Sequence, residues 1–228
     1  MDFIRFETLI GKYNFDYLKN MRIVIVGIGG VGGYALESLV RCGIENFLII
    51  DYDKVDISNK NRQIIADDDS IGKLKTLIFK DRISKINKSC KVDIENIFLN
   101  QDNLNIILDY KPDYVIDACD SLNTKKAIID LCVNNNIKFI TSMGTGKRLD
   151  ASKLEITTLN KTSYDPIAKI LRKHVKDNHI NKKINVLFSR EIPKKIESDF
   201  IPSCSYVPST AGLLITSFVI NDLISNKE

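Results

Sequence analysis

The feature that most constrains the fold is a short apolar run followed at once by clustered glycines. Arg22–Val26 (RIVIV) is mostly apolar and β-branched, which is typical of a buried parallel strand. A helical pattern begins soon afterwards, near Tyr34. Glycines let the backbone turn sharply, and the following helix N-terminus offers free N–H groups to a phosphate. The context favours a nucleotide loop over a tight turn without a ligand, and its candidate binding residues are Gly27, Gly29, Gly30 and Gly32.

Strands and helices then alternate from residue 21 to about residue 142. This order predicts an α/β fold, a Rossmann-like and mostly parallel sheet with helices on both faces. We expect strands at Arg22–Val26, Phe47–Ile50, Val92–Ile94, Tyr114–Asp117 and Lys138–Thr141, and helices at Tyr34–Arg41, Lys73–Ile86 and Asn123–Val133.

The chain is expected to form a single domain over residues 1–228, with an N-terminal arm at 1–20 and an α+β extension at 150–228. No extension segment looks able to bury a core of its own, so we expect all of them to pack on the first part. They are strands at Lys153–Leu159 and Asn185–Ser189 and helices at Pro166–Val175 and Thr210–Ile224.

The sequence predicts a cytoplasmic protein without a membrane span. The apolar run Ala211–Ile220 is too short to cross a bilayer, and the acid-containing N-terminus lacks the apolar run of a signal peptide. Five cysteines are scattered without CxxC spacing, which argues against a structural zinc site or a disulfide framework. Cys204 is the one cysteine in a plausible catalytic region, although a structural role is the simpler interpretation.

A carboxylate follows the second predicted strand. Asp51 lies 24 residues after Gly27, where its oxygens can accept hydrogen bonds from ribose hydroxyls. This arrangement suits NAD as well as it suits ATP, so a non-catalytic NAD-binding module stays open at this point.

The residues after Asp51 distinguish the two nucleotides. The chain continues with Asn59, an Arg62-Gln63 pair, a Gly72-x-x-Lys75 segment and a late Asp120. This combination resembles the ubiquitin-activating-enzyme superfamily, whose bacterial members activate carboxylates with ATP. The resemblance implies that Asp51 binds ribose, Asn59 and Arg62 contact phosphates, Lys75 stabilises phosphate charge and Asp120 holds magnesium.

These implied roles suit the chemistry of adenylation. Negative charge builds on the phosphates as pyrophosphate leaves, and cations and a metal counter it. Taken singly, Arg62 and Lys75 would be solvated surface charges, and Asp120 would be a helix N-cap. Their joint occurrence, in order and on the expected elements, makes coincidence implausible.

The N-terminus matches the same superfamily. Arg5 stands where relatives place an arginine that reaches across a dimer to the partner's ATP, so a homodimer is expected; an ordinary surface arginine is the alternative.

Further matches point to one group within the superfamily, and they lie at residues 5–11, 28–32, 61–64, 82–87, 115–118, 165–166 and 205–212. In these segments the chain resembles the tRNA threonylcarbamoyladenosine dehydratases. The likeness implies that ATP and magnesium activate the threonyl carboxylate beside the tRNA anticodon, and that a nucleophile of the same modification closes a ring. Cysteine-desulfurase or sulfur-acceptor partners accompany some relatives. An adenylyltransferase acting on a ubiquitin-like sulfur carrier is the alternative.

A basic stretch from Lys161 to Lys195 supports an RNA partner. It carries ten lysines and arginines against three acids, and both histidines of the chain lie within it. Clustered cations are the electrostatic footprint of nucleic-acid binding, although a solvated helix face in a lysine-rich chain has the same composition.

Overall fold

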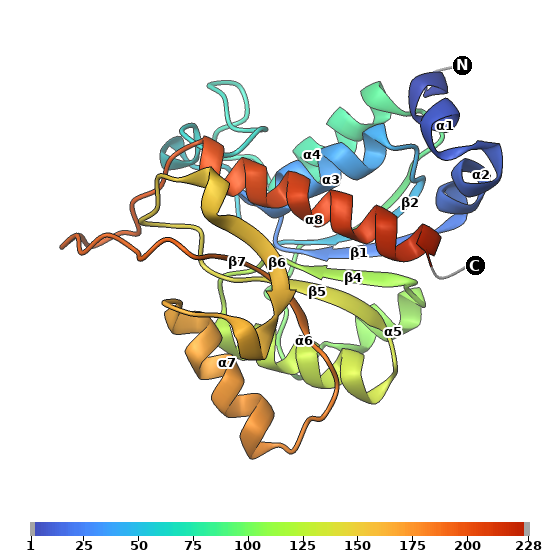
Figure 1. The fold of residues 1–228 in the computed structure, drawn as a ribbon. Coiled ribbons are helices and arrows are strands. Elements are labelled where there is room, and N and C mark those ends of the chain that lie inside the picture. The colour runs from blue at the N-terminus through green and yellow to red at the C-terminus, as the bar shows by residue number, and fades with distance from the viewer. Residues whose placement is uncertain (1–2, 226–228) are drawn as a thin grey trace.

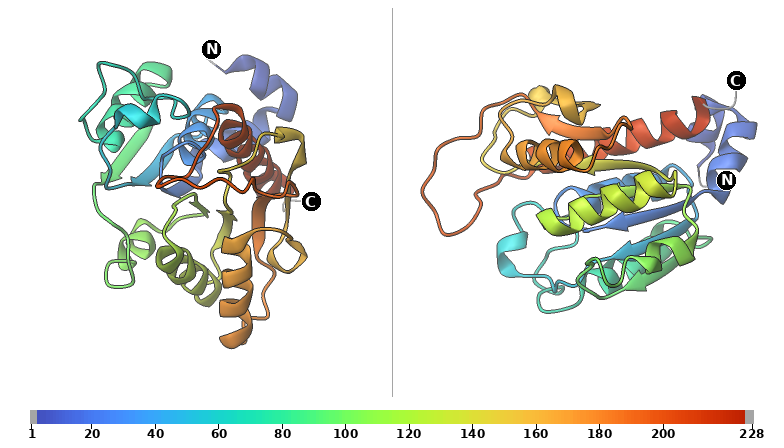
Figure 2. Two further views of the ribbon diagram at one scale, coloured as in Figure 1. Left: turned by 90° about the vertical axis from the view of Figure 1, so that its left-hand side faces the viewer. Right: turned by 90° about the horizontal axis from the view of Figure 1, so that it is seen from below.

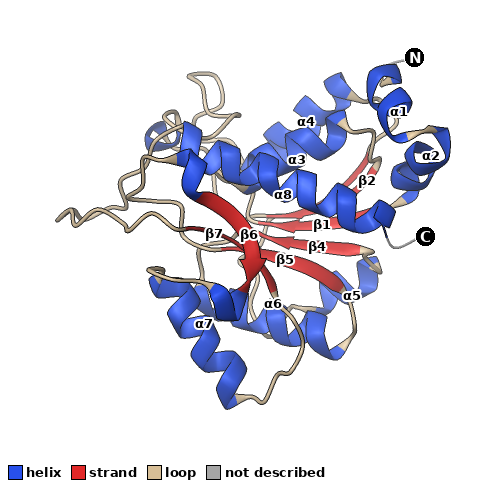
Figure 3. Cartoon of the chain, viewed as in Figure 1, coloured by secondary structure: helices blue, strands red, loops and turns tan. Residues whose placement is uncertain are grey.

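A computed structural model describes residues 3–225, and its centre is one seven-stranded sheet (Figures 1 and 3). The strand order is β3-β2-β1-β4-β5-β7-β6, and only β6 runs antiparallel, against β7. The predicted mostly parallel α/β sheet is confirmed. The strands are β1 (Arg22–Val26), β2 (Asn46–Ile50), β3 (Lys91–Glu95), β4 (Tyr114–Asp117), β5 (Lys138–Ser142), β6 (Leu154–Thr158) and β7 (Asn185–Ser189).

Helices cover both faces of the sheet (Figures 1 and 2). One layer holds α1 (Ile4–Ile10), α2 (Lys12–Asn20), α3 (Gly32–Arg41), α4 (Lys75–Ile86) and α8 (Tyr206–Ile224). The other layer holds α5 (Asn105–Tyr110), α6 (Leu122–Asn134) and α7 (Pro166–Asp177). Short 3-10 turns occur at Ile57–Asn59, Ala151–Lys153 and Leu159–Lys161.

Two cores result from the alternation of side chains along the central strands. Ile23 and Ile25 of β1 belong to the core beneath α3 and α8, whereas Val24 and Val26 belong to the core beneath α6 and α7. Because both faces of β1 are buried, its sequence shows a continuous apolar run rather than an alternating one.

Helix α8 ties the C-terminal part of the chain to the nucleotide loop. A Cβ atom on Gly212 would lie 2.4 Å from the Val31 carbonyl oxygen, so only glycine permits this approach to α3. The Thr216 hydroxyl donates to the Ala35 carbonyl at 3.1 Å. By length and composition α8 is apolar enough to cross a membrane, yet half of its apolar window is buried inside the fold. Its apolar character therefore has an explanation in core packing.

Several predicted boundaries were wrong. Helix α8 has 19 residues and begins at Tyr206 rather than Thr210, because Pro208 is compatible with a first helical turn. Helix α4 begins at Lys75 rather than Lys73, because Leu74 still forms a β-bridge with Lys54.

The N-terminal segment folds as two helices, which the sequence analysis described only as an arm. Phe15 and Leu18 of α2 are buried, and the Phe15 ring lies where a side chain at Gly43 would stand, 2.5 Å from an added Cβ atom. Helix α5 was also missed, because its six residues are too few to show a clear period.

Candidate nucleotide-binding site

A cleft of about 920 Å³ lies at the carboxyl ends of the parallel strands. Strand order reverses between β1 and β4, and loops that leave opposite sides of such a point leave a crevice for ligands. We call residues 27–31, 51–63 and 75 the glycine-loop wall, and residues 144–148, 165–167 and 193–203 the C-terminal wall. Both walls line this one cleft.

The four predicted glycines divide into two groups. Gly27, Gly29 and Gly30 line the cleft. Gly27 has φ of 81°, and a Cβ atom on Gly32 would stand 1.9 Å from the Gly27 carbonyl oxygen. Gly32 does not line the cleft, so its part is to allow the turn to close and α3 to begin. The nucleotide contacts of the four glycines stay predictions.

The Asp51 carboxylate is fixed by the backbone on each side. One oxygen accepts the Ile28 N–H at 2.9 Å, and the other accepts the Asp53 N–H at 2.8 Å. Burial raises the pKa of Asp51, and the nearby Lys75 ammonium opposes that rise. Each oxygen keeps a lone pair, so the carboxylate lies ready for a hydroxyl donor in the cleft.

The predicted phosphate-binding residues meet on the same wall. Lys75, at the first position of α4, is 6% exposed and pairs with Asp53 at 2.6 Å. Arg62 extends along the loop and donates to the Ser58 carbonyl at 2.9 Å. Asn59 is buried at the cleft, and its amide oxygen accepts the Asp56 N–H at 3.2 Å. Their phosphate contacts stay predictions.

Asp120 is exposed at the cleft and is not a helix cap. Ser121 caps α6 instead, accepting the Thr124 N–H at 3.3 Å, so the N-cap alternative for Asp120 is wrong. No hydrogen bond or ion pair engages Asp120 among residues 3–225. The pKa of the nearby Tyr52 phenol is raised, first by the negative charge of Asp53 and by burial, and then by the charges of Asp120 and Asp51.

A buried ion pair lies under the cleft, and the sequence analysis did not anticipate it. Lys125 pairs with Asp117 at 3.0 Å, with side chains 1% and 0% exposed. Thr141 donates to the same Asp117 oxygen at 2.5 Å, and the other oxygen accepts the Cys119 N–H at 3.1 Å. The pair thereby fixes the loop that carries Asp120.

Gln63 is a further residue to which the sequence analysis gave no role. Its side chain is buried at the cleft, and its Oε1 atom has no hydrogen-bond partner among the described residues. Buried polar atoms are nearly always hydrogen-bonded, so this unpartnered oxygen, in a residue that lines the cleft, makes Gln63 a candidate for contact with a bound water or ligand. The adjacent Arg62-Gln63 motif was the signal that pointed here.

The comparisons with known proteins agree with this geometry. Residues 4–188 match the model of the ThiF family. The tRNA threonylcarbamoyladenosine dehydratase of Bacillus subtilis is 36% identical over 99% of this chain and 96% of its own length. This chain belongs to the ThiF family, among the tRNA threonylcarbamoyladenosine dehydratases. The fold and the resemblance stated from the sequence are thereby confirmed.

Solved structures agree as well. The tRNA threonylcarbamoyladenosine dehydratase of Escherichia coli in complex with AMP superposes with a TM-score of 0.93, at 33% identity over 99% of this chain and 94% of the other. The complex of that protein with ATP gives a TM-score of 0.92 at 32% identity, with the same coverage.

Two other candidate residues of this ThiF-family chain are not among the residues that line the cleft. Arg5 is exposed on α1, which stands at the amino ends of the strands, so it does not reach the cleft of its own chain (Figure 1). The Cys204 thiol donates to the Arg148 carbonyl at 3.6 Å, and Cys204 is not among the lining residues. Cys119 does line the cleft, but burial raises the pKa of its thiol, which disfavours a nucleophilic thiolate.

The basic stretch of this ThiF-family chain separates into free and engaged cations. Lys169, Lys173 and Lys176 are exposed at helical spacing on α7, so they share one face. Arg172 instead donates to the Thr162 carbonyl at 3.1 Å. His174 is also engaged, with Asp130 at 2.8 Å. We call the first three side chains the α7 lysine stripe.

Proposed function

We propose that this protein uses ATP to activate the carboxylate of a threonylcarbamoyl group on tRNA and closes that group into a ring. The observation that carries the proposal is the gathering of Arg62, Lys75 and Asp120 around Gly29 and Gly30 in one cleft. The end-to-end likeness to dehydratases, one of them solved with ATP and with AMP, supports it.

The glycine-loop wall suits a triphosphate. Backbone N–H groups of the loop and the N-terminus of α3 favour negative charge, and Asp51 accepts hydrogen bonds from the ribose. Arg62 and Lys75 supply positive charge where pyrophosphate leaves. Lys75 is already oriented by Asp53 at 2.6 Å, so little reorganisation accompanies its contact with a phosphate.

The proposed reaction has two balanced steps. First, a carboxylate oxygen of the substrate attacks the α-phosphorus of ATP, and pyrophosphate leaves. Second, a nucleophilic atom of the same modification attacks the activated carbonyl carbon, and AMP leaves with the original carboxylate oxygen. One proton is released from the nucleophile, so the modified base loses the elements of water overall.

Magnesium fits the donor set as a proposal. No cluster of three or more His, Cys, Asp or Glu side chains occurs among residues 3–225. A magnesium ion that is shared with substrate phosphates needs only one or two protein carboxylates, and Asp120 is exposed at the cleft with no partner in the described part of the chain. Asp120 would hold the ion, which would neutralise developing phosphate charge.

We assign the RNA-facing surface to the α7 lysine stripe, in place of the whole stretch from residue 161 to 195. Lys169, Lys173 and Lys176 project from a helix whose N-terminus, at Pro166 and Ile167, borders the cleft. An RNA strand lying along the stripe would therefore lead toward the nucleotide. A cytoplasmic location suits a tRNA substrate.

A two-fold homodimer is the proposed assembly. Arg5 lies far from its own cleft, so any catalytic part for it requires a second copy. Leu9 and Tyr13 beside it are 79% and 72% exposed, which suits a surface that packs against another chain. Light scattering at micromolar concentration is expected to give twice the monomer mass, and a monomer with full activity would contradict the assembly. Sulfur-handling partners stay a prediction from the superfamily.

Substrate-stimulated ATP cleavage distinguishes the proposal from its alternative. We expect tRNA that carries threonylcarbamoyladenosine to stimulate AMP and pyrophosphate release, and tRNA without the modification to have no effect. Stimulation by a small protein ending in Gly-Gly, and not by the modified tRNA, would instead show a sulfur-carrier adenylyltransferase.

A further inference from the structure

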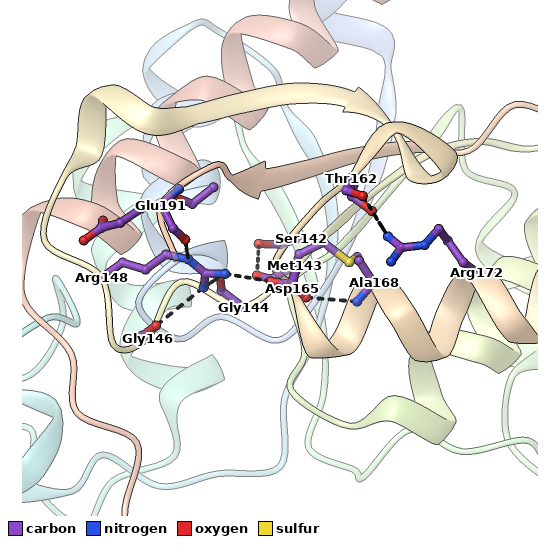
Figure 4. A network of polar contacts seen from close by, with 11 residues as sticks. Ser142, Met143, Gly144, Gly146, Arg148, Thr162, Asp165, Ala168, Arg172 and Glu191 are labelled. Atoms are coloured by element: carbon purple, nitrogen blue, oxygen red, sulfur yellow. Dashed lines mark hydrogen bonds and ion pairs between the residues drawn. The ribbon is translucent and has the colours of Figure 1, made fainter. Parts of the chain in front are cut away.

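The C-terminal wall is centred on an ion pair that is almost completely buried (Figure 4). Arg148 and Asp165 meet at 3.0 Å, and their side chains are 2% and 0% exposed. Removing one partner of such a pair leaves an uncompensated charge in the interior. Both residues nevertheless border the cleft, so the pair is part of the wall opposite the glycine loop.

Arg148 joins three segments of the chain. One guanidinium nitrogen donates to the Gly144 carbonyl in the loop after β5, and Nε donates to the Glu191 carbonyl at 3.3 Å. The Glu191 carboxylate in turn accepts the N–H groups of Leu149 and Asp150, at 3.0 and 2.8 Å. The loop after β5 and the segment after β7 are therefore locked together at this arginine.

Asp165 connects the Arg148 contacts to α7. Its second carboxylate oxygen accepts the Ala168 N–H at 2.9 Å and caps the helix, with Pro166 in the first helical position. Figure 4 shows this cap continuous with the Arg148 contacts. The helix that bears the lysine stripe is thus fixed at its cleft end by a buried charge pair.

We propose that Arg148 and Asp165 are a positioning pair that sets the direction of α7 relative to the nucleotide. With α7 so placed, tRNA bound along it presents the carboxylate of its threonylcarbamoyl group to the α-phosphate of ATP. The proposal rests on the proposed function. Small displacements of reacting groups cost large factors in rate, about a hundredfold for about 1 Å. The pair therefore acts on the rate of adenylation and not on either affinity.

Asp165→Asn separates the cap from the charge pair. An asparagine side chain still caps the helix, whereas its neutral amide leaves the Arg148 guanidinium without a counter-charge. Arg148→Lys keeps the charge but has no planar fork with which to contact Gly144 and Glu191 together. The double variant Arg148→Met, Asp165→Asn removes both charges, so no unpaired charge remains in the interior. Lys153→Met is the matched control, because its ion pair with Asp150 is exposed.

The test is single-turnover AMP formation with modified tRNA, beside separate tRNA and ATP affinities for each variant. We expect Asp165→Asn and the double variant to be about tenfold to a hundredfold slower, with both dissociation constants within about twofold of wild type. Arg148→Lys is expected to lie between them and wild type, and Lys153→Met to equal wild type.

Four outcomes decide between these interpretations. Wild-type rates in the folded Asp165→Asn and Arg148→Lys variants would overturn the proposed positioning role. A rate loss that is fully explained by weaker ATP binding would also overturn it. A wild-type protein that does not cleave ATP in response to modified tRNA would overturn the proposed function instead. A slow rate with unchanged affinities, and partial recovery in Arg148→Lys, would support the pair.

Discussion

The glycine-loop wall and the C-terminal wall face each other across one cleft, but they differ in how far the charges on and beside them are exposed to solvent. On the first wall Lys75 pairs with a carboxylate that is itself 43% exposed, and in the neighbouring loop after β4 Asp120 is exposed. On the second wall Arg148 and Asp165 satisfy each other out of contact with water. Accessible charges can contact a ligand, whereas the contacts of a buried ion pair hold segments of the chain in place.

This difference predicts where substitutions act. Changes in accessible charges of the glycine-loop wall and its neighbouring loop should lower the rate and leave the fold intact. Changes in buried pairs should alter stability or geometry. Three sets of substitutions, in decreasing order of expected effect, can break or sharpen this contrast.

The largest effect is expected for Lys125→Met, in the buried pair under the cleft. The substitution leaves Asp117 as an uncompensated buried charge, which costs about 3–5 kcal/mol of unfolding free energy. Urea denaturation measures the loss. Lys126→Met, on the next residue of α6, should change stability by less than about 0.5 kcal/mol. Equal stability of the two variants would show that the Asp117–Lys125 pair does not support the fold.

Asp120→Ala should come next, with an effect on rate alone. We expect adenylation to slow by about a hundredfold or more, because the site loses a group that acts on charge developing in the transition state. Stability should be unchanged, since Asp120 has no partner within residues 3–225. Asp109→Ala, an exposed acid on α5, is the matched control. Normal turnover of Asp120→Ala at limiting magnesium would contradict the metal assignment.

The smallest effect per residue is expected from the α7 lysine stripe. Lys169→Ala, Lys173→Ala and Lys176→Ala should each weaken tRNA binding and flatten the log–log salt dependence by about one unit per phosphate contact. ATP affinity should stay at the wild-type value. Lys80→Ala, exposed on α4, and Lys88→Ala, exposed in the turn after α4, serve as controls. A wild-type salt slope in the triple stripe variant would place the RNA surface elsewhere.

The glycine-loop wall was largely predictable from the sequence because its signals are local. The strand before Gly27 and the helix after Gly32 follow from apolar periodicity, and Asp51 directly follows β2, whose residues 47–50 are all apolar. The cleft then follows from topology, since loops at the carboxyl ends of parallel strands must meet at one edge of the sheet.

The C-terminal wall was not predictable in the same way. Asp165-Pro166 does indicate a helix start, and α7 begins there. The periodicity of apolar residues does not predict that Asp165 pairs with Arg148, because the contact depends on how a loop and a helix pack. Lys125 was missed for a related reason: a lysine beside Lys126 on a helix has the pattern of a solvated face, although tertiary packing buries it.

The most direct measurement is mass spectrometry of nucleosides from modified tRNA after incubation with the purified protein, ATP and magnesium. The proposed function predicts that threonylcarbamoyladenosine is converted to a product lighter by one water, with one AMP formed for each product. Omission of ATP, or use of Asp120→Ala, should leave the nucleoside unchanged over the same time. An unchanged nucleoside with wild-type protein and ATP, under conditions where the protein binds both substrates, would contradict the proposed function.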